Sequence, residues 1–301
     1  YYLQDASSNT LTQSWIRTPN GIDASCYGAY LIGASRNNVI SYSTISMPGP
    51  SGTALWADGA DDNTVTQSYL HGGESAAQIR WSSDGNAISL STLTNSTVDN
   101  PALYIFESSS NTVSDSFLAS PLGMGLFIEG PATGNSVNRS TMTGGSATYG
   151  ALYAFGGSSN TITQSYLLGA SVGAYLEAGA NDNVISVSTI IGSSGAALYV
   201  AMAGSNTVTQ SYLWGGTWGA FLDAGADYNA VSLSTVIGAG DVGLYGTGVS
   251  SNVVTQSYFW GANSGIALEG GVGYNSISLS TMIGSAGYGF LANNSASNTV
   301  T

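Results

Sequence analysis

The residues best suited to acid–base chemistry lie around His71, the only histidine in the chain. Several carboxylates are close to it in sequence: Asp58, Asp61, Asp62 and Glu74. An imidazole beside a carboxylate can act as a general acid or base, and a group of carboxylates can bind a cation. However, Gly72 and Gly73 indicate a turn, where a solvated histidine is ordinary, and the aspartates lack the spacing of a calcium loop. We therefore predict no catalytic residue, no metal site and no cofactor.

The chain as a whole also contains few side chains that could take part in catalysis. The 301-residue chain has 17 acidic residues, four arginines and no lysine, and its formal net charge is −13. Four arginines cannot form the basic surface that nucleic acids require, which excludes a nucleic-acid partner. Most enzymes draw on a larger set of histidines, lysines and arginines, so we predict that the protein is not an enzyme.

The composition is that of a folded protein with an acidic surface. Apolar residues make up 43% of the chain, and 18 tyrosines, 7 phenylalanines and 6 tryptophans favour burial over disorder. No apolar run reaches the length of a membrane span, so we expect no membrane insertion. A lysine-free, acidic surface favours an extracellular or cell-surface location. The single cysteine, Cys26, cannot form a disulfide within the chain.

An eight-residue motif repeats along the whole chain. It reads asparagine, any residue, an aliphatic residue, usually serine or threonine, any residue, serine, any residue and an apolar residue. The leading asparagines are Asn9, Asn38, Asn63, Asn86, Asn111, Asn135, Asn160, Asn183, Asn206, Asn229, Asn252, Asn275 and Asn298. They are 23 to 29 residues apart, and the interval is 23 from Asn160 onward. This period, with short β-branched runs and Gly-rich turns, favours a β-coil over helical repeats, which are longer and rich in Ala, Leu, Glu and Lys.

The motif also predicts how each coil is built. Two or three short strands fit into one coil, and stacking the coils in register forms parallel sheets that rise about 4.8 Å per turn. The aliphatic positions fill the interior. Asparagine tolerates the left-handed backbone that a corner needs, and stacked asparagines can pass amide hydrogen bonds from turn to turn. The repeated serine is small enough for an inward corner, where the same column of serines would satisfy its hydroxyl.

These runs resemble the repeats of right-handed parallel β-helix proteins, the pectin-lyase-like superfamily. The resemblance is carried by segments such as Asn183–Ile190 (NVISVSTI) and Asn206–Leu213 (NTVTQSYL) and covers the whole chain. It implies an all-β fold: a single-stranded right-handed parallel β-helix of about 12 coils of 23–25 residues. The family holds lyases, hydrolases, epimerases, phage tailspikes and surface adhesins, so the resemblance is specific for the fold and not for an activity.

A second period spans two coils, 46 residues in the regular part. Six residues after the asparagine, aromatic residues and threonine alternate: Trp15, Thr44, Tyr69, Thr92, Phe117, Thr141, Tyr166, Thr189, Tyr212, Thr235, Tyr258 and Thr281. We call the two kinds aromatic turns and threonine turns. Four residues after the asparagine, most aromatic turns carry glutamine, whereas threonine turns carry apolar residues such as Leu233 and Leu279. If exposed, these apolar residues favour lateral packing between copies.

The two-coil period also places charges. Six residues before the next asparagine, aromatic turns carry Arg80, Glu129, Glu177, Asp223 and Glu269. Threonine turns carry Ile105, Ala154, Val200, Gly246 and Ala292 there. Strand alternation puts Tyr175 on the same face as Glu177, and Phe221 on the same face as Asp223. We therefore predict a surface stripe of rings and carboxylates on every second turn, about 9.6 Å apart, suited to sugar or to lateral packing. Its residues are Phe127, Glu129, Tyr175, Glu177, Phe221, Asp223 and Glu269.

The organisation predicted is one continuous β-helix over residues 1–301, with less regular coils in 1–135 and regular 23-residue coils in 136–301. Inserts lengthen the corners around Arg17–Gly21, Met47–Gly52, Thr94–Pro101 and Ala119–Gly123. Any specific site is expected in these inserts, because loops carry chemistry that a repeat cannot. The sequence ends within a motif, so we expect a segment of a longer array.

Two functions of different classes follow. The first is a structural segment of an extracellular or cell-surface rod, stalk or filament that self-associates end to end or laterally. The alternative is a β-helix that binds or processes polysaccharide, as lyases, hydrolases and tailspikes do. A cleft that joins the inserts, His71 and carboxylates would favour the alternative. Threonine columns also suit ice binding, but the alternating rings interrupt the flat array that ice requires.

Overall fold

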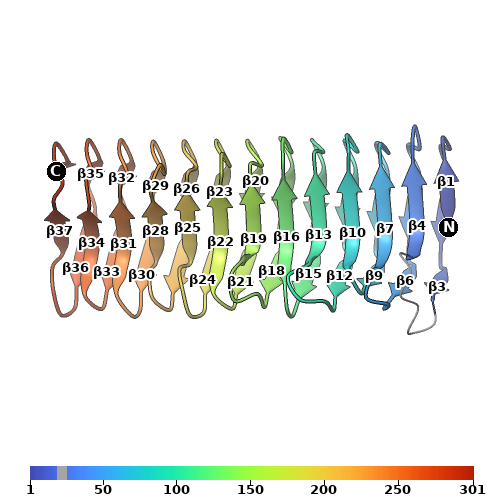
Figure 1. Ribbon diagram of the computed structural model, residues 1–301, viewed down its shortest axis with the longest axis horizontal. Coiled ribbons are helices and arrows are strands. Elements are labelled where there is room, and N and C mark those ends of the chain that lie inside the picture. Colours follow the sequence, from blue (N-terminus) through green and yellow to red (C-terminus); the bar gives the residue numbers. More distant parts are fainter. Residues whose placement is uncertain (19–25) are drawn as a thin grey trace. The chain divides into compact units, whose positions relative to one another are not determined.

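The structure, a computed structural model, describes residues 1–18 and 26–301. The chain forms two compact units, Tyr1–Ser146 (unit 1) and Ala147–Thr301 (unit 2), and each is described by itself. Three parallel sheets make up each unit, and every turn contributes one strand to each sheet (Figure 1). This confirms the predicted all-β solenoid of about 12 turns. Residues 19–21 of the insert predicted at Arg17–Gly21 lie outside the described residues.

In unit 1 the sheets follow the order of the turns. The first sheet contains β1 (Tyr2–Gln4), β4 (Cys26–Ile32), β7 (Gly52–Asp58), β10 (Ser75–Arg80), β13 (Pro101–Phe106) and β16 (Met124–Glu129). The second contains β2 (Thr10–Thr12), β5 (Val39–Ser41), β8 (Thr64–Thr66), β11 (Ala87–Ser89), β14 (Thr112–Ser114) and β17 (Ser136–Asn138). The third contains β3 (Trp15–Arg17), β6 (Thr44–Met47), β9 (Tyr69–Gly72), β12 (Thr92–Asn95), β15 (Phe117–Ser120) and β18 (Thr141–Gly144).

Unit 2 repeats this order with more uniform turns. Its first sheet contains β19 (Gly150–Phe155), β22 (Val172–Glu177), β25 (Leu198–Ala201), β28 (Ala220–Asp223), β31 (Val242–Thr247), β34 (Ser264–Glu269) and β37 (Phe290–Asn293). The second contains β20 (Thr161–Thr163), β23 (Val184–Ser186), β26 (Thr207–Thr209), β29 (Ala230–Ser232), β32 (Val253–Thr255), β35 (Ser276–Ser278) and β38 (Thr299–Val300). The third contains β21 (Tyr166–Gly169), β24 (Thr189–Gly192), β27 (Tyr212–Gly215), β30 (Thr235–Gly238), β33 (Tyr258–Gly261) and β36 (Thr281–Gly284).

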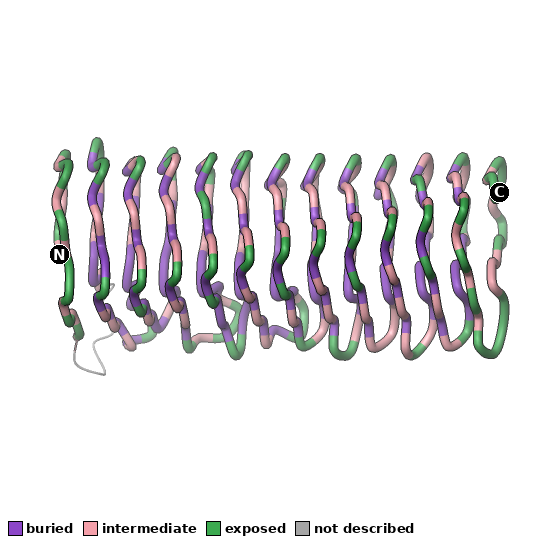
Figure 2. The backbone as a smooth tube through the Cα atoms, turned by 180° about the vertical axis from the view of Figure 1, so that it is seen from behind, coloured by how far each residue is buried: buried purple, intermediate pink, exposed green. Residues whose placement is uncertain are grey.

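Like side chains stack on like in the core of each unit. The aliphatic residue two places after the asparagine is buried from Ile40 to Ile277, and Ile40, Val65 and Ile88 face one another across β5, β8 and β11. Figure 2 shows buried segments on the interior turns, whereas the N-terminal and C-terminal turns are intermediate or exposed. Since strand side chains alternate between faces, the inward residue of each three-residue strand is the apolar one.

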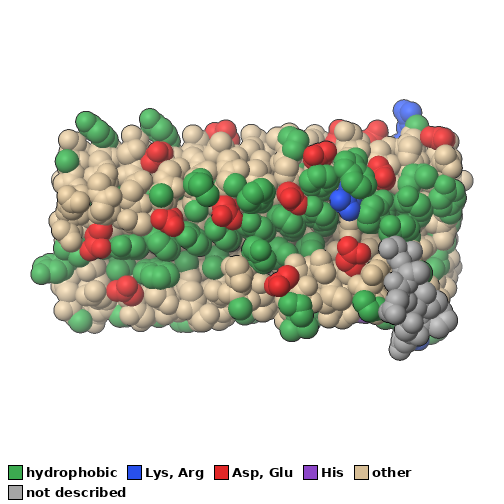
Figure 3. Space-filling view, in the orientation of Figure 1, with side chains coloured by type: hydrophobic (Ala, Val, Ile, Leu, Met, Phe, Trp, Pro, Cys, Tyr) green, Lys and Arg blue, Asp and Glu red, His purple; other side chains and the backbone are tan. Residues whose placement is uncertain are grey.

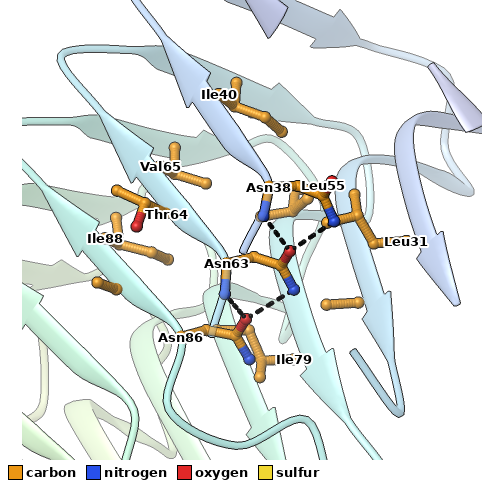
Figure 4. Close-up of a pocket in the computed structure, with 12 residues that line it drawn as sticks. Leu31, Asn38, Ile40, Leu55, Asn63, Thr64, Val65, Ile79, Asn86 and Ile88 are labelled. Carbon is orange, nitrogen blue, oxygen red and sulfur yellow. Dashed lines mark hydrogen bonds between the residues drawn. The ribbon is translucent and has the colours of Figure 1, made fainter. Parts of the chain in front are cut away.

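The predicted asparagine ladder is confirmed. The backbone N–H and the Nδ2 of Asn38 both donate to Oδ1 of Asn63, at 3.0 and 2.9 Å, and the N–H of Asn63 donates to Oδ1 of Asn86 at 2.8 Å (Figure 4). All three side chains are buried. The void beside them is only about 10 Å³, so this part of the core has no room for a ligand.

The serine column is satisfied by a mixed pattern. The backbone N–H of Ser43 donates to Oγ of Ser68 at 3.2 Å, and Oγ of Ser43 donates to the carbonyl of Ser41 at 2.8 Å. Each hydroxyl therefore links the preceding turn to its own turn. The column does support itself, as predicted, but through backbone amides instead of a hydroxyl-to-hydroxyl chain.

The prediction that the asparagines themselves supply the left-handed corner is wrong. The residue before the ladder asparagine has positive φ, 55° at Asn37 and 54° at Asp62. A second left-handed residue lies four places after the asparagine, such as Gln67 at 48° and Leu90 at 49°. The ladder residue immediately precedes a strand and aims its amide inward, so the left-handed bend falls on the residue before it.

We expect Asn63→Ala to lower the free energy of unfolding by about 3 kcal/mol, because it leaves buried donors of Asn38 without an acceptor. Thr64→Ala, one residue along and half-buried, is the matched control and should cost about 1 kcal/mol or less. Chemical denaturation of both variants measures the difference. Equal losses would mean that the ladder contributes nothing beyond strand propensity.

Candidate functional site

The predicted stripe lies on the outward face of the first sheet. Strand alternation buries Leu176 and Leu222, while Tyr175, Glu177 and Asp223 face outward and are half-buried. The other predicted residues, Phe127, Glu129, Phe221 and Glu269, are also half-buried and outward. Within each unit, Figure 3 shows a band of hydrophobic side chains on this face with acidic side chains along it.

The rings occur on every turn of much of the stripe, so the prediction of one ring per two turns is wrong. In unit 2, Tyr175 and Tyr199 stack with centroids 4.7 Å apart, and Tyr199 and Phe221 with centroids 4.8 Å apart. In unit 1, Tyr104 and Phe127 stack at 5.0 Å. Near-parallel rings at this spacing attract one another, so no empty turn is needed between them.

The sequence explains why the rings on threonine turns were not predicted. Counting back from the asparagine aligns Glu177 with Val200, but the sheet register pairs Glu177 with Ala201 and Tyr175 with Tyr199. The corner before the asparagine is one residue shorter on threonine turns. The ring column could therefore have been found by aligning the strands instead of the corners.

The carboxylates do alternate as predicted, and each accepts a hydrogen bond from the preceding turn. The Tyr153 hydroxyl donates to Glu177 at 2.8 Å, and the Tyr199 hydroxyl donates to Asp223 at 2.8 Å. Two further pairs repeat this contact, Tyr245 with Glu269 and Tyr104 with Glu129. The two-turn period thus has a direct cause: a tyrosine on a threonine turn donates to an acid on the next aromatic turn.

This contact keeps the tyrosine hydroxyls protonated. Burial, and then the hydrogen bond to Asp223, raise the pKa of Tyr199 to about 12. The pKa values of Tyr153 and Tyr104 are raised for the same two reasons, with burial the larger. The stripe therefore pairs protonated tyrosine donors with carboxylate acceptors, and its carboxylates are already engaged.

We expect Tyr199→Phe to lower the free energy of unfolding by about 1 kcal/mol, because it removes a partly exposed hydrogen bond to a charged group. A tyrosine whose folded pKa is raised stabilises the fold below its unfolded pKa of about 10 and loses this contribution as the pH rises towards 12. Unfolding at pH 8 to 12 should show a smaller decline for Tyr199→Phe than for the wild type. Tyr212→Phe is the control, since its hydroxyl has no hydrogen bond among the described residues. A stability profile unchanged from wild type would contradict the pairing.

The stripe is interrupted on one turn of unit 1. Gln78 occupies the ring position between Trp56 and Tyr104, and Arg80 occupies the carboxylate position. The Arg80 guanidinium carbon lies 4.1 Å from the ring centroid of Trp81 and 4.9 Å from that of Trp56, and its Nη1 donates to Oε1 of Gln78 at 3.1 Å. Where the ring is missing, the Arg80 guanidinium is surrounded by aromatic side chains instead.

A recess of about 200 Å³ opens at this interruption. Its polar lining residues are Glu74, Gln78, Arg80, Asp99 and Asn100. Tyr104 and Phe127 supply the apolar walls. Asp99 and Asn100 belong to the insert predicted at Thr94–Pro101, which is where sequence reasoning expected a specific site. Nε of Arg80 and Nε1 of Trp56 are buried and have no hydrogen-bond partner in the part of the chain that the structure describes.

His71 does not belong to this recess. It lies in strand β9 and not in the predicted turn, its ring stacks on that of Tyr69, and its Nδ1 lies 2.9 Å from the Thr94 hydroxyl. Partial burial lowers its pKa. The recess lining includes Glu74 but not His71, so the two candidate acid–base residues are not brought together there.

Asp61 and Asp62, close to His71 in sequence, have roles in the backbone structure of the corner. Oδ1 of Asp61 accepts the backbone N–H of Asp84 at 2.9 Å, and Asp62 adopts a left-handed φ of 54° at the corner. Over residues 1–18 and 26–301, no three His, Cys, Asp or Glu side chains are grouped so that they could hold a metal ion. Cys26 begins β4 as a half-buried free thiol.

Comparison with known families identifies the fold. The model described as "Right handed beta helix region" matches residues 2–167 and 150–301. The chain therefore belongs to the right-handed β-helix family, and the resemblance to pectin-lyase-like proteins is confirmed. No curated protein sequence matches it. The described residues contain no helix with the length and hydropathy of a membrane span.

Three solved structures share the fold. The ORF18 protein of Geobacillus virus E2 is 10% identical with a TM-score of 0.59, over 81% of this chain and 54% of that one. A mutant of the periplasmic alginate epimerase AlgG is 10% identical with a TM-score of 0.62, over 91% and 71%. The Dettilon tailspike protein is 10% identical with a TM-score of 0.55, over 83% and 61%. At such identity the likeness concerns the fold alone. This chain spans 54% of the ORF18 protein and 61% of the tailspike protein.

Proposed function

We propose that this chain is a non-catalytic structural segment of an extracellular or cell-surface rod, stalk or filament. One observation supports it most: the repeated polar groups are used between turns. The carboxylates of Glu177 and Asp223 accept tyrosine hydroxyls, and the ladder asparagines bond one another. Groups held in this way stabilise a stack and are not poised to react with a substrate.

The surface location rests on the acidic, lysine-free composition and on the character of proteins with the same fold. One neighbour is described as a tailspike protein and another as periplasmic. A stack held by ladders suits a protein that must persist outside the cell, because each turn is stabilised by both of its neighbours.

The structural role can be tested by assaying for processing and by locating the native material. We expect the purified chain to leave alginate, polygalacturonate and neutral polysaccharides unchanged, with or without Ca²⁺. Unsaturated ends would reveal a lyase, reducing ends a hydrolase, and an altered uronate ratio by NMR an epimerase. Any one of these products would refute the structural proposal. Immunogold electron microscopy of the source cells should find the protein in elongated surface structures, and a diffuse cytoplasmic label would also contradict it.

The recess at Gln78 favours a second candidate function, binding of a carbohydrate without turnover. A sugar ring can lie against Tyr104 and Phe127 while its hydroxyls reach Gln78, Asp99 and Arg80. Aromatic faces beside paired polar groups recognise sugars, because C–H groups pack on the ring while the hydroxyls form hydrogen bonds. The volume of about 200 Å³ accommodates about one sugar unit.

Filling the recess tests this second function. We expect Gln78→Phe to restore the missing ring, retain the fold and weaken binding of any oligosaccharide about tenfold or more in calorimetry. Gln164→Phe adds the same ring at an exposed corner of unit 2 and should leave binding unchanged. A wild-type chain that binds no member of a panel of neutral and uronate oligosaccharides would eliminate the carbohydrate site, as would binding that Gln78→Phe does not alter.

A further inference from the structure

The outward face of the third sheet in unit 2 is apolar on every turn. Its residues are Tyr166, Leu168, Thr189, Ile191, Tyr212, Trp214, Thr235, Ile237, Tyr258, Trp260, Thr281 and Ile283, called here the apolar face. All of them are half-buried or exposed, and none is charged. The adjoining corner adds Val187, Leu233 and Leu279, with exposed fractions of 50%, 52% and 74%. Leu233 and Leu279 therefore meet the condition of exposure under which the sequence favours lateral packing.

The same face of unit 1 shares exposed rings, such as Tyr69 and Phe117, but it lacks the second column of large apolar residues and carries charged and polar side chains there. Its corresponding positions include Arg17, His71 and Thr94, and its corner carries an ion pair in which Nε of Arg139 lies 2.8 Å from Oδ1 of Asp115. Both units build this sheet from the same motif, so the fold does not require the apolar side chains of unit 2. A contiguous, uncharged apolar surface on a chain of net charge −13 is typical of an interaction site.

We propose that the apolar face of unit 2 packs against the same face of a second copy of this chain, with the two stacks of turns running in opposite directions. Charge favours this occupant. Two acidic copies repel one another over most of their surfaces, but they can meet on a face that carries no charge. Flat β-sheet faces pack in this way at about 10 Å, with interdigitating side chains.

The alternation of turns selects the opposed orientation. The face has six turns, from β21 to β36, in which bulky Tyr-containing turns alternate with smaller Thr-containing ones. A two-fold axis parallel to the strands reverses the order of turns, so that β27 of one copy faces β30 of the other. Tyr212 then lies against Thr235 of the second copy, and Trp214 lies against Ile237. With both stacks running in the same direction, a two-fold axis along the stack brings each turn against its own copy. Tyr212 would then meet Trp214, whereas Thr235 would meet Ile237 and leave a gap.

The size of the face predicts a modest affinity. It offers three outward positions on each of six turns, counting the corner, which is slightly fewer than the about 20–30 residues per side of a standard interface. Association should therefore be reversible at ordinary concentrations. The inference deepens the structural role proposed above and rests on it, but its test measures association alone, so the two can fail separately.

Sedimentation velocity of the full chain over a wide concentration range tests the proposal. We expect reversible dimers, and we expect Tyr212→Asp to raise the dissociation constant about tenfold or more. Phe117→Asp is the matched control, since Phe117 has the same motif position in unit 1 and is 41% exposed against 40% for Tyr212. It should leave the dissociation constant within about twofold.

A second pair of variants guards against loss of folding. Leu233→Asp and Leu90→Asp both replace an exposed leucine at a φ of about 50°, where aspartate is better tolerated than leucine. Only Leu233→Asp should weaken the dimer. A wild-type chain that stays monomeric throughout, including one that binds an insoluble polysaccharide through this face, would overturn the proposal. Equal effects of the two leucine variants would overturn it as well.

Cross-linking decides the orientation. In a Cys26→Ser background, Tyr166→Cys and Thr281→Cys place thiols on opposite ends of the apolar face, about 24 Å apart. With a short bismaleimide, mixing the two variants should give a cross-linked dimer, whereas Thr281→Cys alone should not. A cross-linked dimer from Thr281→Cys alone would refute the opposed arrangement.

Discussion

The structure depends on one constraint: equivalent residues of neighbouring turns lie only about 4.8 Å apart. Each column must therefore consist of residues that can pack against, or bond to, copies of themselves. Aliphatic residues such as Val65 do so by packing on their counterparts. A buried polar residue does so only if it can both donate to and accept from a copy of itself. Asparagine meets that requirement, which is why Asn38, Asn63 and Asn86 remain buried at little cost. Aspartate or lysine in the same column would repeat a like charge at a repulsive distance.

The outward columns meet the same constraint in a different way. Rings repeat on successive turns, because stacking is attractive, whereas carboxylates appear on every second turn and are separated by turns that supply a donor. In the Tyr199–Asp223 pair, for example, the tyrosine hydroxyl of one turn donates a hydrogen bond to the carboxylate of the next turn. Binding chemistry becomes available where the columns are broken. Gln78 and Arg80 interrupt both columns at once, and a recess opens there.

The two units use one fold for different surfaces. Unit 1 carries the inserts, the interruption at Arg80 and a third sheet with charged and polar side chains among its rings, whereas unit 2 is regular and presents an apolar third sheet. A repeat that is stabilised from within leaves its outward positions free to vary, because side chains on that face contribute little to the ladders. Recognition and association can therefore be assigned to different turns of the same chain without altering its core.

The sequence by itself determined the turns, the buried aliphatic columns, the asparagine ladder and the outward carboxylates, because each follows from a local pattern that repeats with the period of the fold. Only the tertiary structure decided which residues face one another between turns. The left-handed corner falls beside Asn63 and not on it, and Tyr199 pairs with Tyr175, because a one-residue difference in corner length shifts the register. The recess likewise joins Arg80 to Asp99 across neighbouring turns, a contact set by register and by the path of an insert, for which a linear motif has no signal.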